Sequence, residues 1–143
     1  MTDDTGLAYR VLQPAAWPRP RGYANGVMAS GTMIVLAGQI GWDEQGRFAD
    51  GMAGQVEQAL RNIVRLLAEA EAAPQNIVRM TWFVTDMPAY RDSQAAIGAA
   101  YRRVIGKHFP AMSVIGVSQL VESEALVEIE ATAVLPPRRG TKA

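Results

Sequence analysis

The chain has 143 residues, of which 49% are apolar, with 14 basic and 14 acidic side chains and no cysteine. This length and apolar content predict a single globular domain over residues 1–143 and exclude an intrinsically disordered chain. The net charge of zero gives no attraction to nucleic acid or to an anionic membrane, and the lack of cysteine excludes disulfides and thiolate nucleophiles. Residues 1–5 lack the apolar run of a signal peptide, and no stretch approaches the ~20 apolar residues of a membrane span, so we expect a cytoplasmic protein.

The first third of the chain contains predicted strands. Residues 7–12 predict a short edge strand, and an irregular, proline-containing segment follows up to residue 22. Residues 27–30 and 32–37 flank Gly31 and predict a β-hairpin. Residues 43–46, with the sequence DEQG, predict a turn before the first helix.

A helical period then begins. Apolar residues recur at spacings of four and three, which predicts an amphipathic helix over residues 54–72. Its buried stripe consists of Val56, Leu60, Ile63, Leu67 and Ala70. The opposite face carries charged side chains, as a solvated face should.

Over residues 77–85 the side-chain pattern repeats every two residues, which predicts a strand. Val78, Met80, Trp82 and Val84 would lie on one face of it. Asp86 and Pro88 are typical of the cap and first turn of a second helix, and Gly106 of its end. The buried stripe of this helix consists of Tyr90, Ile97, Tyr101 and Val104. Residues 112–118 and 125–134 predict two further strands, and residues 136–140 begin a polar tail.

The predicted order is β-β-β-α-β-α-β-β, an α+β fold with two helices on one face of a mixed sheet. The other face of the sheet is rich in Val, Met and Trp, and no further helix is available to cover it. We therefore expect other copies of the chain to cover that face.

Five segments, in this order and spacing, resemble the motifs of one family. They are GYANG at 22–26, AGQI at 37–40, QALRNI at 58–63, VTDM at 84–87, and the strand pair FPAMS at 109–113 with VEIEA at 127–131. On these motifs the chain resembles the YjgF/Rid family over residues 22–135. The resemblance implies a chorismate-mutase-like fold and a homotrimer whose sheets pack into a barrel, with three clefts between neighbouring subunits. Many members hydrolyse enamines and imines derived from amino acids, releasing ammonia, and need no metal or organic cofactor.

The chain departs from the family pattern at the expected site. The family glutamate that handles the attacking water matches Glu128, but the arginine that pairs with the substrate carboxylate is replaced by Met112. The serine of the strand end is replaced by Ala37, and the cysteine of the founding subgroup by Val114. Methionine cannot form the bidentate, charge-assisted contact of an arginine, so deamination of the family's usual 2-imino acids cannot simply be carried over to this chain.

The predicted catalytic residue is Glu128, which shares a strand face with Glu130 and would exchange a proton with water. A solvated, arginine-paired face is the alternative for both glutamates. The predicted substrate-binding residues are Tyr23, Ala37, Gly38, Gln39, Met112 and Val114. Packing is the alternative for the Tyr23 side chain, and a tight bend or turn for residues 37–39.

His108 is the only histidine, and the pattern favours a helix-end cap over a member of a catalytic triad or a metal site. The leading hypothesis is a hydrolytic enamine/imine deaminase that acts on a small metabolite and needs no cofactor. Two alternatives remain: a non-catalytic trimer that binds a small metabolite in the same clefts, and an endoribonuclease. The neutral charge argues against RNA as a partner.

Overall fold

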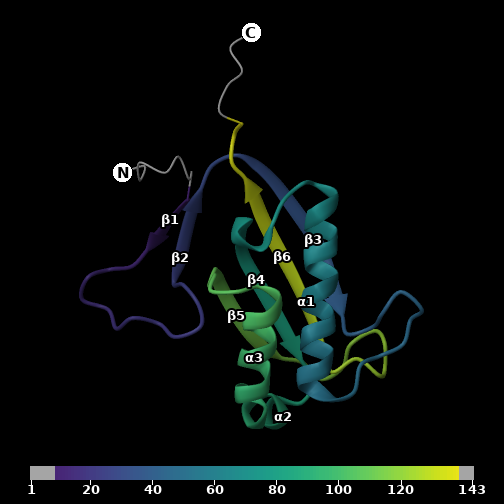
Figure 1. Ribbon diagram of the computed structural model, residues 1–143. Coiled ribbons are helices and arrows are strands. Elements are labelled where there is room, and N and C mark those ends of the chain that lie inside the picture. The colour runs from purple at the N-terminus through teal and green to yellow at the C-terminus, as the bar shows by residue number, and fades with distance from the viewer. Residues whose placement is uncertain (1–8, 139–143) are drawn as a thin grey trace.

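A mixed four-stranded sheet forms the centre of the computed structural model, which describes residues 9–138 (Figure 1). Its strands lie in the order β3 (Thr32–Ile40), β6 (Val127–Leu135), β4 (Ile77–Val84) and β5 (Ala111–Gly116). Strand β6 pairs antiparallel with both β3 and β4, and β5 pairs parallel with β4. The parallel pair requires a crossover between β4 and β5, and helices supply it.

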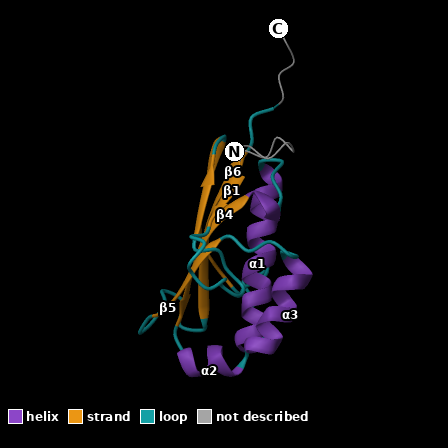
Figure 2. Ribbon diagram, turned by 90° about the vertical axis from the view of Figure 1, so that its left-hand side faces the viewer, coloured by secondary structure: helices purple, strands orange, loops and turns teal. Residues whose placement is uncertain are grey.

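Helices α1 (Gly51–Glu69) and α3 (Gln94–Val104) cover one face of this sheet, and the short helix α2 (Met87–Asp92) lies at the lower end of the sheet, as the side view in Figure 2 shows. The predicted stripe of α1 is confirmed for Val56, Leu60, Ile63 and Leu67, which are fully buried, whereas Ala70 is half-buried and caps the end of the helix. A short 3₁₀ turn, η1 (Pro74–Asn76), leads from α1 into β4. The predicted α+β fold with helices on one sheet face is thereby confirmed.

The single second helix of the prediction is divided at Ser93, so that α2 and α3 follow one another. The predicted cap is confirmed: the Asp86 side chain accepts a hydrogen bond from the Ala89 N–H at 2.9 Å. Gly106, two residues beyond the end of α3, has a φ of +86°, which suits a glycine at a helix end.

The predicted hairpin of residues 27–30 with 32–37 is wrong. Strand β2 (Gly26–Ala29) pairs with β1 (Tyr9–Leu12) in a separate two-stranded ribbon, and β3 pairs with β6 instead. The chain changes sheets at Gly31, whose φ is +143° and where a Cβ would lie 2.1 Å from the Leu135 carbonyl oxygen. Residues 7–8 of the predicted first strand and residues 139–140 of the predicted tail lie outside the described residues.

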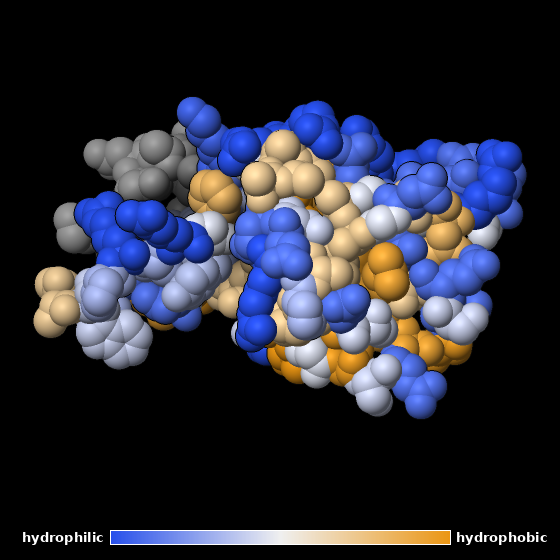
Figure 3. Space-filling view, turned by 90° about the horizontal axis from the view of Figure 1, so that it is seen from below, coloured by the Kyte–Doolittle hydropathy of each residue, from blue (hydrophilic) through white to orange (hydrophobic). Residues whose placement is uncertain are grey.

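The second face of the sheet carries no helix among the described elements. Met33 and Val35 of β3 are 67% and 71% exposed on this open face. Figure 3 views the end of the molecule and shows polar surface along one rim and apolar surface gathered along the opposite rim. The prediction for Val78 is wrong, because the β4–β6 register shifts between Ile77 and Arg79, and Ile77 is buried in the core instead.

Candidate functional site

The open face holds a β-bulge at the end of β3. The β3–β6 register shifts between Leu36 and Gln39, so Ala37 and Gly38 have no paired partners on β6. The Gln39 side chain donates a hydrogen bond to the Ala37 carbonyl at 3.1 Å, so a backbone acceptor of the bulge is satisfied within the bulge. A bulge of this kind re-aims the backbone and the neighbouring side chains next to it.

Glu128 lies directly beside this bulge. It is paired with Ile40 on one side and Phe83 on the other, and the flanking residues Val127 and Ile129 point into the core. A Cβ at position 38 would lie 2.6 Å from Oε1 of Glu128, so the glycine leaves room for the carboxylate against the bulge backbone. Glu128 is half-buried and has no ion pair or hydrogen bond through its carboxylate among residues 9–138.

Met112 and Val114 lie on the other face of the sheet. They pair in parallel with Met80 and Trp82, so their side chains share the helix-covered face with those core residues. Both line a cavity of about 480 Å³ between α3, the edge strand β5 and the loop before β2. The cavity volume falls within the range of about 300–1,000 Å³ that small-molecule sites occupy.

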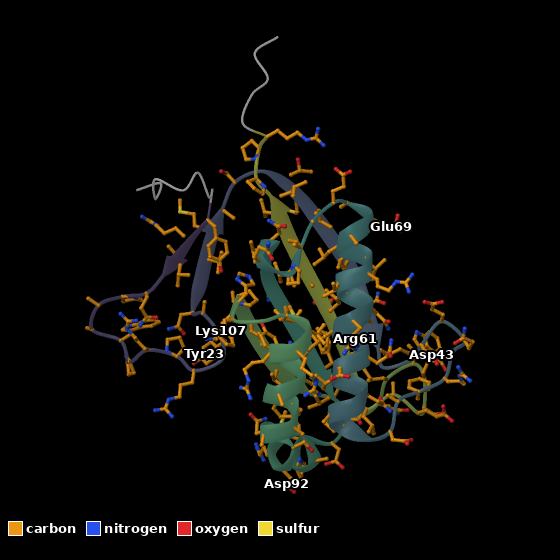
Figure 4. The ribbon with its side chains drawn as sticks, viewed as in Figure 1. Tyr23, Asp43, Arg61, Glu69, Asp92 and Lys107 are labelled. Carbon is orange, nitrogen blue, oxygen red and sulfur yellow. The ribbon has the colours of Figure 1, made fainter. Side chains whose placement is uncertain are left out.

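Tyr23 is held at this cavity by a backbone contact. The Ala24 N–H donates to the Pro110 carbonyl at 3.0 Å, and Ala24 forms an isolated bridge with Ala111 at the start of β5. Tyr23 lines the cavity and is 42% exposed. Figure 4 shows it between the N-terminal ribbon and α3.

Aromatic side chains form much of the remaining wall of the cavity. The Tyr101 and Phe109 rings stack with centroids 5.6 Å apart and planes at 9°, and Trp82 lies 6.4 Å from both Tyr90 and Tyr101. Burial raises the pKa of the Tyr101 hydroxyl, which donates a hydrogen bond to the His108 carbonyl. The Trp82 Nε1–H has no partner among the described residues.

A polar stripe on α3 was not predicted from the sequence. Gln94, Gly98 and Arg102 follow one another at a spacing of four and all line the cavity, as does Arg21 from the entry loop. The spacing of four was the available signal. Two adjacent arginines such as residues 102–103 are, however, typical of a solvated surface, and in sequence they favour that reading over a cavity wall. That reading holds for Arg103, whose Nε donates to Glu57 Oε1 at 2.9 Å on the outer surface.

The predicted site residues therefore form two groups on opposite faces of one sheet. The first, the bulge group, consists of Ala37, Gly38, Gln39 and Glu128; the second, the cavity group, consists of Tyr23, Met112 and Val114. One copy of the chain does not bring the two groups together.

Several side chains outside these two groups have structural partners. Asn25 donates to the Gln13 side chain at 3.0 Å, and Trp42 packs on Phe48. His108 is not a cap on its own helix, because a ring nitrogen, Nε2, donates to the Ile77 carbonyl at 2.7 Å. Within residues 9–138 no three His, Cys, Asp or Glu side chains cluster as metal ligands would, and no helix is long and apolar enough to cross a membrane.

The described residues form a small α+β domain, with helices on one face of a mixed sheet and a glutamate beside a strand bulge. Comparisons with known proteins show the family to which such a domain belongs. The family model described as Endoribonuclease L-PSP matches residues 15–135. A RutC family protein of Synechocystis is 33% identical over 91% of this chain and 99% of its own length. A 2-iminobutanoate/2-iminopropanoate deaminase of Salmonella typhimurium is 33% identical over 73% of this chain and 80% of its own length.

The crystal structure of a Rid family protein of unknown function from Yersinia pestis is also similar. It superimposes with a TM-score of 0.78 at 34% identity, covering 90% of this chain and all of the other. This chain belongs to the Endoribonuclease L-PSP family, also called the YjgF/UK114 or Rid family.

Proposed function

We propose that this protein hydrolyses the C=N bond of a small imine, or of its enamine tautomer, with Glu128 as the acid and base. The observation that carries the proposal is the placement of Glu128: a half-buried carboxylate without an ionic partner among the described residues, set between the buried Val127 and Ile129 and against the Gly38 backbone. Relatives named 2-iminobutanoate/2-iminopropanoate deaminase support the reaction class. Their names concern those proteins; on the family resemblance, Met112 stands at the position of the arginine that pairs with a substrate carboxylate.

Glu128 would act twice in this reaction. Its carboxylate accepts a proton from water as the water oxygen bonds to the imine carbon, and passes that proton to the nitrogen, which takes the electron pair of the broken π bond. The hydroxyl proton of the adduct then moves through the carboxylate to the amino nitrogen. The C–N bond breaks, ammonia leaves with the electron pair, and the carbonyl product forms.

The proposed site is shared between copies of the chain. The bulge group contains the Glu128 carboxylate, and the cavity group lines the space for the substrate. The two groups lie on opposite faces of the sheet. Exposed Met33 and Val35 on the open face favour covering that face with further copies. A closed homotrimer, as the family resemblance implies, would place the bulge group of one subunit beside the cavity group of its neighbour.

The test is ammonia release from imines generated in situ by an amino-acid oxidase, with acidic, basic, aliphatic and aromatic amino acids. We expect the wild type to accelerate release and Glu128→Gln to lose about 100-fold or more of that acceleration. Glu130→Gln is the matched control, since Glu130 lies on the same strand and face but is exposed beside Thr81. Full activity of Glu128→Gln on a confirmed substrate would refute the proposal.

A non-catalytic trimer that binds a small metabolite is the second candidate. The apolar side chain of Met112 in the cavity favours it, because the group that would grip a carboxylate at that position is absent. Saturable binding of a ligand in the cavity without turnover of any imine would support it. The endoribonuclease alternative has less support, since the only histidine donates from its ring to the Ile77 carbonyl.

A further inference from the structure

The strand wall of the cavity is unsuited to an anionic group. Met112 and Val114 present apolar side chains there, and the aromatic rings of Trp82 and Tyr101 lie beside them. A carboxylate placed against this wall would lose its hydration without gaining a partner, which is costly. An acidic ligand must therefore direct its carboxylate toward the opposite side of the cavity.

Two guanidinium groups line the cavity from elements other than the strands, one on α3 and one on the loop before β2. Arg21 and Arg102 both line the cavity and are exposed, and neither forms an ion pair with an acidic side chain of residues 9–138. The neighbouring Arg103 differs, because Glu57 already neutralises it. Arg21 and Arg102 are thus the cavity-lining cations available to a ligand carboxylate.

Gly98 sets the place of the Arg102 side chain. A Cβ built at Gly98 would lie 3.6 Å from Nη1 of Arg102, with no other atom within 4 Å apart from its chain neighbours and the backbone of its own helix. The guanidinium therefore folds back one helical turn over the glycine, onto the stripe that lines the cavity. Glycine is unfavourable inside a helix, and here its missing side chain leaves this space open.

The rest of the cavity suits a flat, apolar ring. Tyr101 and Phe109 stack nearly parallel, and Phe109 and Tyr23 remain 41% and 42% exposed on the cavity although they are large aromatic side chains. Aromatic rings arranged in this way bind another ring by offset stacking or edge contact. The volume of about 480 Å³ also accommodates a ring as well as a short acidic chain.

We propose that the cavity binds a small acid with an aromatic ring, whose ring lies against the exposed side chains of Phe109 and Tyr23 and whose carboxylate is held by Arg102 together with Arg21. This inference rests on the proposed function, since it names the substrate class of the same site: imines of aromatic amino acids. Arg102 then takes over, from α3, the carboxylate contact that Met112 cannot make from β5.

The first experiment measures binding without turnover, by calorimetry on the full-length Glu128→Gln protein. The probes are 3-phenylpropanoate, its neutral amide 3-phenylpropanamide, and butanoate, which keeps the carboxylate and lacks the ring. We expect 3-phenylpropanoate to bind about tenfold more tightly than either of the other two. Adding Arg21→Gln and Arg102→Gln should abolish the preference for acid over amide, while adding Arg103→Gln should preserve it.

The second experiment measures ammonia release from the imines of phenylalanine and alanine with the wild type and the double variant Arg21→Gln/Arg102→Gln. We expect the wild type to prefer the phenylalanine imine and the double variant to raise KM for it about tenfold. Equal binding of acid and amide, or an unchanged double variant, overturns the inference and leaves the deaminase proposal standing if imines are hydrolysed. Preferential binding of the aromatic acid without hydrolysis of any imine overturns the deaminase proposal and leaves this ligand class standing.

Discussion

Glu128 occupies the space that any side chain at position 38 would need. A Cβ at Gly38 would lie 2.6 Å from both Cδ and Oε1 of Glu128 and 2.7 Å from its Cγ. Because Gly38 does not have a positive φ, the backbone itself would accept an L side chain. The contact between the two residues, and not backbone strain, is therefore what requires glycine at the β3 bulge.

Gly38→Ala should displace the Glu128 carboxylate and lower imine hydrolysis at least about tenfold, because a small displacement of a catalytic group is costly. The free energy of unfolding should fall by about 1 kcal/mol or less, since the Glu128 side chain can swing toward the open face. Gly54→Ala on α1 is the control, because its Cβ would make an ordinary 3.5 Å contact with Ala49. Equal activity of the two variants would show that the position of Glu128 does not matter.

Gln55→Leu should destabilise the fold by about 2–3 kcal/mol, because it leaves two backbone groups without partners. The buried Gln55 side chain donates to the Glu124 carbonyl at 3.0 Å and accepts from the Leu126 N–H at 2.8 Å, which fixes the loop just before β6. Urea unfolding measures the loss. The exposed Gln119 provides the control, and a Gln55→Leu protein as stable as Gln119→Leu would contradict this role.

The Glu57 carboxylate should stabilise the fold only above acidic pH. Hydrogen bonding to Arg103, aided by the charge of Arg61, holds the pKa of Glu57 below its ordinary value of 4.5. A carboxyl group with a lowered folded pKa contributes stability that is complete above its unfolded pKa and is lost as the pH falls through the folded pKa. Glu57→Gln should therefore cost about 0.5–1 kcal/mol at pH 7 in low salt.

The difference between wild type and Glu57→Gln should shrink toward zero as unfolding is repeated at successively lower pH. A difference that stays constant or grows on acidification would contradict the assignment of the stabilisation to the charged carboxylate.

Val35→Lys should prevent assembly of the chain. Val35 is 71% exposed on the open sheet face, where we expect a neighbouring subunit to cover it. Analytical ultracentrifugation should find the wild type at three times the 15.5-kDa chain mass and the variant at or near the mass of one chain. Leu66→Lys, at an exposed apolar position of α1, should assemble as the wild type does. A wild type that stays monomeric at micromolar concentration would contradict the assembly.

Local sequence patterns were sufficient for much of the fold. The stripe of α1 and the cap at Asp86 depend on residues three or four apart, and both are present. The hairpin about Gly31 failed because a glycine between two apolar runs serves equally well where a chain changes sheets. Strand β2 pairs with β1, and β3 pairs with β6, which is distant in sequence. These two pairings exclude the hairpin.

The candidate site was predictable only in part. The motif residues lie at a bulge and a cavity, but alternation along single strands could not reveal that Glu128 and Met112 lie on opposite faces, because this depends on the register between strands. The position of Arg102 at the cavity was not predictable, because adjacent charges on a helix look alike in sequence. Only the positions of Gly98 and Glu57 distinguish Arg102, which lies over the cavity, from Arg103, which is neutralised.

The most direct test of a site shared between subunits is to mix two inactive variants. Glu128→Gln removes the proposed acid and base, and Gly98→Phe fills the cavity of the other group; each should be inactive alone. After joint unfolding and refolding of equal amounts, with mass spectrometry to verify mixed assemblies, ammonia release should recover to about a quarter of the wild-type rate, since random assembly leaves about one cleft in four with both groups intact. Mixed assemblies that remain inactive would contradict a site formed by Glu128 of one subunit and the cavity of its neighbour.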